Sequence, residues 1–259
     1  AFHKDKQKIY NYIIENIGEM LSQLSLELAK LRENTKENTR FKSEIAKKMN
    51  DSTKIFLPRF ITPLASVAGA ISETLLDKVL SKFNLKKIFI NNGGDVAIFL
   101  KKKQTLKFLV ATTNNFLITL EGDGCKYGVA TSGWKGRSFS MGIADSVTTI
   151  ARSSSIADAA ATIIANDTNI ENHKNIKKQK ANKIDEYSDL KNKLITTSVG
   201  ELSENDIKEA LKKGTITAKK LIEKKIILTA LLSVKENYVY VGKKFDIEQT
   251  NKKINFIKL

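Results

Sequence analysis

Residues 129–166 read VATSGWKGRSFSMGIADSVTTIARSSSIADAAATIIAN. The β-branched run Ser146–Ala151 predicts a strand, and the alanine-rich run Ile156–Ala165 predicts a helix. Glycines, alanines and polar residues concentrate here and in the segment that starts at Ile90. This concentration indicates that residues 90–166 carry the function as well as the centre of the fold.

Hairpin strands are predicted on the N-terminal side of this stretch. Lys86–Ile90 and Val96–Leu100 flank an Asn-Asn-Gly-Gly-Asp turn, and Leu106–Val110 and Asn115–Leu120 continue the pattern. Leu64–Leu85 predicts a helix with a thin face of alanine and glycine, against which another backbone can pack closely.

The first 50 residues predict a helical N-terminal arm. Apolar residues recur every three or four positions from Lys6 to Leu31, and a second helix is predicted over Thr39–Met49. The apolar stripe either packs on the core, which we favour, or binds a protein partner or a second copy in a homodimer. Pro58 and Pro63 predict an extended segment over Lys54–Ile61.

The C-terminal part predicts further strands and two helices. Asn166–Tyr187 is polar and lysine-rich, which predicts a surface loop or linker. Leu194–Val199, Ile226–Val234 and Tyr238–Val241 predict strands. One helix is predicted from a cap at Ser203 to a stop at Gly214, with a second over Thr217–Lys225.

Hairpin strands mixed with long helices predict an α+β fold. The predicted organisation is a single domain over 1–259, with the arm at 1–50, a core at 54–242 and a charged tail at 243–259. The net charge of +16 comes from lysines scattered along the chain, so it argues against a nucleic-acid module. No membrane segment is predicted, and one cysteine and a polar start predict a cytoplasmic protein.

The residues available for catalysis are few. His3 and His173 are the only histidines and Cys125 is the only cysteine, so neither a zinc site of cysteine and histidine nor a Ser-His-Asp triad is expected. Cys125 lies near a turn without a visible base, and a buried packing role is predicted for it.

Two turns offer groups that suit an anion. Asn92, Gly93, Gly94 and Asp95 form either an anion-binding nest or an ordinary hairpin turn. Residues 131–138 contain two hydroxyls, two glycines and two cations, which suit a phosphate or form a loop around Trp134. The candidate ligand residues in this second turn are Thr131, Ser132, Gly133 and Arg137.

The alanine-rich helix offers oxygen ligands. Asp158 and Thr162 are four positions apart, so they share a face of that helix, and Asp145 precedes the neighbouring strand. Such an oxygen-rich set suits Mg²⁺ better than zinc, while an acidic residue in the first turn of a helix is also a favourable dipole partner.

In this order, the segments 64–73 (LASVAGAISE), 90–96 (INNGGDV) and 129–166 resemble the ApbE superfamily, and within it a stand-alone cytoplasmic branch of uncharacterised ApbE-like proteins. The resemblance covers about 63–242 and implies an ApbE-like, T-fold-like domain with antiparallel sheets and packed helices. It also implies a site for FAD or another flavin or nucleotide with Mg²⁺. Asp158 and Thr162 match its metal ligands, and the Gly93–Asp95 and Thr131–Gly133 turns match the flavin-facing segments.

Three positions depart from the family pattern. Gly142 stands where flavin transferases carry a histidine, Ser146 where they carry a proline, and Ser72 where they carry a lysine. The resemblance therefore implies a small anionic ligand and a role in redox or sulfur metabolism rather than standard FMN transfer. The alternatives are a non-enzymatic accessory or assembly protein and an FMN transferase with a different base. No catalytic residue is assigned, and whether the protein is an enzyme stays open.

Overall fold

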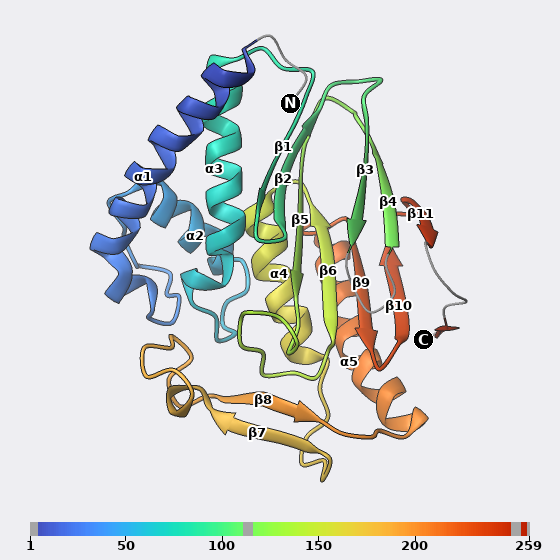
Figure 1. The fold of residues 1–259 in the computed structure, drawn as a ribbon. Helices are drawn as coiled ribbons and strands as arrows, with labels where there is room; N and C mark the ends of the chain where they lie inside the picture. The colour runs from blue at the N-terminus through green and yellow to red at the C-terminus, as the bar shows by residue number, and fades with distance from the viewer. Residues whose placement is uncertain (1–4, 111–115, 250–254, 258–259) are drawn as a thin grey trace. The chain divides into compact units, whose positions relative to one another are not determined.

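The computed structural model of the chain describes residues 5–110, 116–249 and 255–257. The chain forms two compact units. The first contains the residues up to 105 together with 121–129 and 152–159, and the second contains 106–120, 130–151 and the residues from 160 onward. Helices and antiparallel strands occur in this structure, which confirms the predicted α+β class (Figure 1). The predicted single domain over 1–259 stays a prediction.

The helical N-terminal arm is confirmed in the first unit. α1 (Lys6–Leu31), α2 (Glu44–Lys54) and α3 (Val67–Lys82) contact one another, and the short 3₁₀ helix η1 (Pro63–Ser66) leads into α3 (Figure 1). One face of α1 is buried in this helical core; its buried residues are Ile9, Met20, Leu24 and Leu31. The favoured interpretation, that the apolar stripe packs on the core, is therefore confirmed for this face.

The strands of the first unit form a hairpin and its neighbour. β1 (Lys87–Asn92) pairs antiparallel with β2 (Asp95–Leu100), and β2 pairs antiparallel with the start of β5 (Lys126–Ser132). α3 packs against β1 and β2. The pairing of Asn92 with Asp95 leaves two glycines, at φ 66° and 116°, to form the turn.

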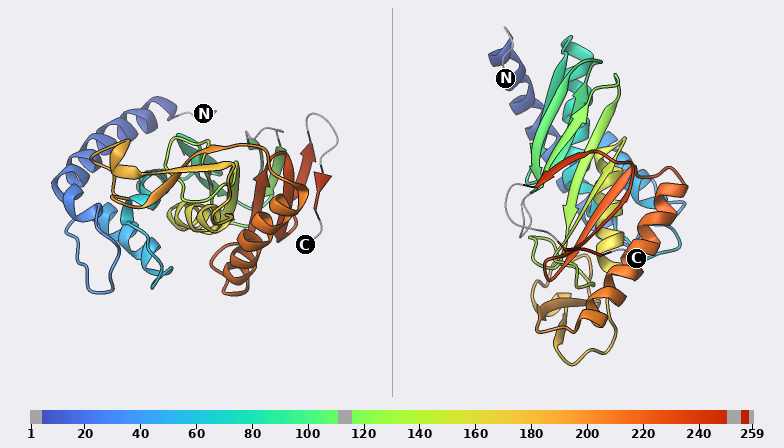
Figure 2. Two further views of the ribbon diagram at one scale, coloured as in Figure 1. Left: turned by 90° about the horizontal axis from the view of Figure 1, so that it is seen from below. Right: turned by 90° about the vertical axis from the view of Figure 1, so that its right-hand side faces the viewer.

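The second unit has a sheet with the neighbours β6, β9, β10 and β12, whose bounds are Ser146–Ala151, Thr229–Val234, Asn237–Gly242 and Asn255–Phe256. α5 (Glu204–Glu223) packs against β9 and β10 (Figure 2). The other strands are β3 (Thr105–Val110), β4 (Phe116–Glu121), β11 (Asp246–Gln249), β7 (Ile176–Lys180) and β8 (Leu194–Val199), with the 3₁₀ turn η2 (Ala181–Lys183). α4 (Ser154–Asp167) begins in the first unit and ends in the second.

The predicted helix stop at Gly214 is wrong, because α5 is one continuous helix through this position. Gly214 is buried, and a Cβ atom there would lie 2.0 Å from Thr168 Oγ1. The glycine therefore permits close packing and does not end the helix. The start of α5 agrees with the prediction, since Ser203 and Asp206 form a capping box.

Other boundaries also differ from the predictions. α2 starts after Ser43, whose hydroxyl accepts the Ala46 N–H. It continues through Lys54, which is the first residue of the segment predicted to be extended. The predicted loop 166–187 contains a strand, β7, which pairs antiparallel with β8 farther along the chain. The predicted tail at 243–259 contains β11 and β12. His3, Asn115 and residues 250–254 of the predictions lie outside the described residues.

Within the described part of the chain, no helix has both the length and the apolar character that a membrane span requires.

Candidate functional site

In the first unit, α3 and the start of α4 approach each other closely. A Cβ atom at Gly69 of α3 would lie 2.3 Å from the carbonyl oxygen of Ser154, and one at Gly128 of β5 would lie 2.2 Å from the Ser154 Cα atom. Only glycine fits at such distances. The predicted thin face on α3 is therefore confirmed, and it brings the carboxylates of α3 to the N-terminus of α4.

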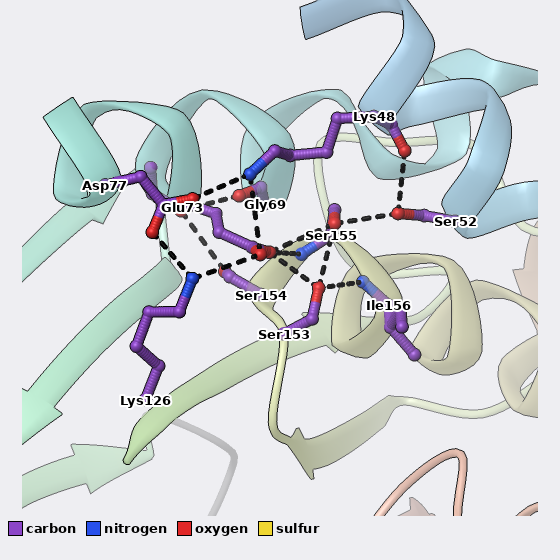
Figure 3. Close-up of polar contacts among 11 residues, drawn as sticks. Lys48, Ser52, Gly69, Glu73, Asp77, Lys126, Ser153, Ser154, Ser155 and Ile156 are labelled. Carbon is purple, nitrogen blue, oxygen red and sulfur yellow. Dashed lines mark hydrogen bonds and ion pairs between the residues drawn. The ribbon is translucent and has the colours of Figure 1, made fainter. Parts of the chain in front are cut away.

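Glu73 of α3 accepts hydrogen bonds from the first turn of α4 (Figure 3). Its Oε2 atom accepts the Ser153 hydroxyl at 2.6 Å, the Ser155 N–H at 3.0 Å and the Ser155 hydroxyl at 3.1 Å. The Ser155 hydroxyl also accepts a hydrogen bond from Ser52 of α2 at 2.7 Å. The buried Glu73 carboxylate thus accepts a backbone N–H that has no partner within α4, at the helix end where the dipole favours a negative charge.

Two lysines compensate the charge of this carboxylate cluster (Figure 3). Lys48 Nζ lies 3.6 Å from Glu73 Oε1 and 2.9 Å from Asp77 Oδ2. Lys126 Nζ lies 2.6 Å from Asp77 Oδ1. Burial alone raises the pKa of Glu73, but the Lys48 cation and the bonds from α4 outweigh burial, so its pKa is lowered. The cluster is therefore ionised and stabilises the α3–α4 contact.

This cluster was not predicted from the sequence. Its serines and Glu73 occur in segments 129–166 and 64–73, but Lys48 and Lys126 come from α2 and β5. A run of three serines before an alanine-rich helix is the signal that indicates a capped helix start here.

Asp158 of α4 is buried beside the same glycine. Its Oδ2 atom accepts the Gly69 N–H at 2.9 Å. Burial raises the pKa of Asp158 well above its ordinary range, and the nearby Asp95 carboxylate raises it further, against the opposing amides of Gly69 and Ala68. The first unit thus brings together two of the predicted ligand residues, Asp95 and Asp158.

The Asn92–Asp95 segment, for which the sequence allowed an anion-binding nest or an ordinary hairpin turn, forms a hairpin turn between β1 and β2. The Gly94 N–H donates to Asn91 Oδ1 at 2.8 Å, and the Asn92 side-chain amide donates to the Ala68 carbonyl at 3.3 Å. The second bond fixes the turn against the start of α3. The turn therefore lies beside the element that holds Asp158.

In the second unit, Asp145 organises the loop between β5 and β6. Its Oδ1 atom accepts the Trp134 indole N–H at 3.1 Å and lies 3.0 Å from Lys135 Nζ, while Oδ2 accepts the Lys235 N–H at 2.7 Å. A Cβ atom at Gly133 would lie 2.4 Å from the Asp145 carbonyl oxygen. The loop interpretation, with Trp134 held in place, describes this segment, and both carboxylate oxygens of Asp145 already have partners.

The hydroxyls of this loop pair with neighbouring elements. Ser132 Oγ lies 3.1 Å from Thr162 Oγ1, and Thr131 Oγ1 lies 2.8 Å from Thr148 Oγ1. Arg137 is exposed on the same loop. Five of the predicted ligand residues therefore lie in the second unit, namely Thr131, Ser132, Arg137, Asp145 and Thr162.

Gly142 has no room for a side chain. A Cβ atom there would lie 2.0 Å from the Ala165 carbonyl oxygen and 2.8 Å from that of Thr168, at the end of α4. The Met141 N–H donates to Asn166 Oδ1 at 2.9 Å and holds the loop at this helix end. Packing therefore excludes a histidine at Gly142 in this conformation.

Cys125 is exposed, so the predicted buried role is wrong. Its N–H donates to Asp123 Oδ1 at 3.0 Å in a tight turn, and this turn carries the side chain to the surface. In residues 5–110, 116–249 and 255–257, no group of three or more His, Cys, Asp or Glu side chains is placed to hold a metal ion.

These features define an α+β protein with a buried aspartate, Asp158, near the half-buried Asp95, and a loop organised by Asp145. Among known families, a model described as AbpE bacteria matches residues 1–243. The chain belongs to this family, and the resemblance to ApbE-like proteins is confirmed.

Sequence relatives agree with this assignment. A UPF0280 protein of Methanosphaera stadtmanae is 35% identical over 130 residues, which cover 49% of this chain and 53% of that protein. A UPF0280 protein of Methanocaldococcus jannaschii is 41% identical over 112 residues, which cover 41% and 44%. The chain spans about half the length of these curated relatives.

Among solved structures, the apo form of the flavinyl transferase ApbE from Pseudomonas stutzeri is similar at a TM-score of 0.39 and 15% identity. The match covers 82% of this chain and 60% of that chain.

Proposed function

We propose that the protein binds an anionic ligand of the flavin or nucleotide type together with Mg²⁺. The observation that carries the proposal is the buried Asp158 carboxylate, which accepts the Gly69 N–H at the point of α3 where the Asn92–Asp95 hairpin turn is held by the Ala68 carbonyl. Two carboxylates at such a site repel each other unless one is protonated or a cation lies near them. The proposed role of the protein is in redox or sulfur metabolism, and its proposed location is the cytoplasm.

The donor set fits Mg²⁺. Mg²⁺ commonly takes one or two protein carboxylates and completes its shell with water and ligand phosphates. Asp158 and Asp95 would supply carboxylate oxygens, and one oxygen of Asp158 is oriented by the Gly69 N–H. When bound, the ion would neutralise phosphate charge. Thr162 and Asp145, together with the Asn92–Gly94 and Thr131–Gly133 turns and Arg137, stay proposed ligand residues.

The chain's own residues would orient the ligand rather than supply a general base. The Asn92 amide holds the hairpin turn at Ala68, and the Trp134 and Lys235 N–H groups hold Asp145. Such fixed groups can bind and position an anion before any chemistry occurs. The packing at Gly142 supports a function other than standard FMN transfer.

Isothermal titration of the protein with FAD, FMN and ADP, each with and without Mg²⁺, tests the proposal. Binding of at least one of them, strengthened by Mg²⁺ in wild type but not in Asp158→Asn, is the expected result. Asp51→Asn is the matched control, because Asp51 is an exposed aspartate of α2. Absence of binding in every titration would overturn the ligand part of the proposal.

A non-enzymatic accessory or assembly protein is the second candidate, and the lack of space at Gly142 favours it. It predicts a stable protein partner in affinity purification together with no bound small molecule in the native mass spectrum. FMN transfer with a different base predicts instead an FMN mass shift on an acceptor protein incubated with FAD and Mg²⁺.

A further inference from the structure

β1 lies at the end of its sheet. Among the strands that the structure describes, only β2 pairs with it. The six residues of β1 pair with β2 without interruption, and they include neither a proline nor a bulge of the kind that protects an edge strand. The outer side of β1 is therefore open to a further strand.

The hairpin register decides which backbone groups face this open side. In an antiparallel pair with a two-residue turn, residues that exchange hydrogen bonds with the partner strand alternate with residues whose backbone groups face away from it. The Lys101 N–H donates to the Lys86 carbonyl at 2.8 Å, which places the even-numbered residues in the bonded positions. The N–H and carbonyl groups of Lys87, Phe89 and Asn91 therefore point away from β2. We call these three residues the β1 edge.

The side chains of the β1 edge are open to solvent as well. All three residues are exposed, and Phe89 is 54% exposed. On the opposite face, Ile88 and Ile90 pack against the helical core but are only half-buried, whereas Ala97 and Ile98 of β2 are buried. An aromatic ring between partly covered isoleucines is an apolar surface that a neighbouring strand would cover.

We propose that the β1 edge pairs with the β1 edge of a second copy of this chain, antiparallel and with the twofold axis at Phe89. In this register Phe89 exchanges two backbone hydrogen bonds with Phe89 of the second copy. Lys87 of each copy does the same with Asn91 of the other. Every outward N–H and carbonyl group of the three residues thus gains a partner, so the edge is complementary to itself.

Side-chain chemistry selects this register. An axis at Lys87 would set two lysines directly opposite each other, and an axis at Asn91 would carry Phe89 past the end of the strand into the turn. With the axis at Phe89, the two rings lie opposite each other and each Lys87 faces a neutral Asn91. On the other face of the sheet, Ile88 lies opposite Ile90. Such aromatic and aliphatic cross-strand pairs stabilise a sheet. The inference concerns assembly and is independent of the proposed ligand.

Sedimentation equilibrium of the full chain over a range of concentrations tests the proposal. The wild type is expected to form a dimer, and F89K is expected to raise its dissociation constant at least about tenfold, because two like charges would meet at the axis. L109K is the matched control, because Leu109 is 50% exposed on a different strand, β3. Thermal unfolding of F89K in dilute solution is expected to match that of L109K, which separates loss of assembly from loss of folding.

A designed charge pair tests the register. N91D keeps the side-chain oxygen that accepts the Gly94 N–H, and it adds a negative charge opposite Lys87 of the second copy. The variant is expected to lower the dissociation constant at least about twofold. The double variant K87E/N91D sets like charges opposite each other and is expected to raise the dissociation constant above that of the wild type. A dimer that N91D weakens would contradict the register.

Residue-resolved amide hydrogen exchange locates the contact. The N–H groups of Lys87, Phe89 and Asn91 are expected to be protected in the dimer and released on dilution, while those of Ile88 and Ile90 stay protected by β2 at both concentrations. A wild type that is monomeric at every concentration, a dimer that F89K leaves unchanged, or outward amides that exchange equally fast in dimer and monomer would overturn the proposal. Protection of these amides by a different, co-purifying protein would assign the edge to another partner and would also overturn it.

Discussion

The Glu73 carboxylate of α3 accepts the Ser155 N–H of α4 at 3.0 Å. This bond joins two helices that are far apart in the sequence and places a negative charge at the start of α4. Asp158, in the same helix, accepts the Gly69 N–H from the same face of α3. The two bonds together hold the candidate ligand residue Asp158 in a defined position.

Substitution Glu73→Gln is expected to destabilise the protein by about 2 kcal/mol, because a charged acceptor of three hydrogen bonds is replaced by a neutral group. Urea unfolding at neutral pH measures the change. Asp51→Asn is the control, since it alters an aspartate whose side chain is 72% exposed, and its effect is expected to stay below about 0.5 kcal/mol. An equal effect of the two substitutions would contradict the role of Glu73.

Glu73 is also expected to make the stability of the protein depend on pH. Its pKa in the folded protein lies below the ordinary value of 4.5, so its carboxylate form stabilises the fold. This stabilisation is fully present above pH 4.5 and is lost as the pH falls through the lowered pKa. The stability difference between wild type and Glu73→Gln is therefore expected to shrink on acidification below 4.5. A constant difference down to acid unfolding would contradict the lowered pKa.

Asp158 is expected to give the opposite dependence of stability on pH. Its raised pKa means that the fold favours the protonated form, and this contribution is present at low pH and lost as the pH rises through the raised pKa. Asp158→Asn is expected to raise the melting temperature above neutral pH by about 2–4 °C, which corresponds to about 1 kcal/mol. The matched comparison is Asp145→Asn, a buried aspartate with cationic and N–H partners, which is expected to lower it.

Gly142 is expected to tolerate no side chain. Gly142→Ala should destabilise the protein by about 3 kcal/mol, because the new Cβ atom would overlap the Ala165 carbonyl oxygen. Gly142→His should prevent folding. Gly136→Ala is the control in the same loop, since its Cβ atom would lie 3.1 Å from the nearest atom. A folded Gly142→His variant in thermal unfolding would show that the loop can move away from α4.

Asp145 predicts a fluorescence change, because Trp134 is the single tryptophan of the chain. Asp145→Ala removes the acceptor of the indole N–H and of the Lys235 N–H. The variant is expected to lose about 2 kcal/mol of stability and to shift the tryptophan emission to the red. Lys135→Met is the control; its side chain is 48% exposed, and its loss should cost less than about 1 kcal/mol. An unshifted emission in Asp145→Ala would contradict this account of the loop.

Local patterns predicted much of the secondary structure. Strands Ser146–Ala151 and Leu194–Val199 have the predicted bounds, and the helix α5 has the predicted cap at Ser203. These features depend on residues that are close in the sequence, so their physical cause can be read from it. The family resemblance came from the same short segments and is confirmed.

Glycine roles show where local reasoning stops. Gly214 has the sequence signature of a helix end, yet it lies inside α5, where Thr168 packs against it too closely for a side chain. Whether a glycine ends a helix, forms a turn or permits close packing depends on the atom that faces it, and that atom belongs to a distant segment. Gly93 and Gly94 form a turn, while Gly69 and Gly142 permit close packing.

The sequence by itself determined the α+β class, the helical arm, the family, and Asp158 and Asp95 as candidate ligands. Only the tertiary structure decided that these two carboxylates lie near each other, that Lys48 and Lys126 compensate Glu73 and Asp77, and that a side chain at Gly142 is excluded. Charge pairing and steric exclusion act over a few ångströms between segments that are far apart along the chain. Their outcome is therefore set by how the backbone brings these segments together.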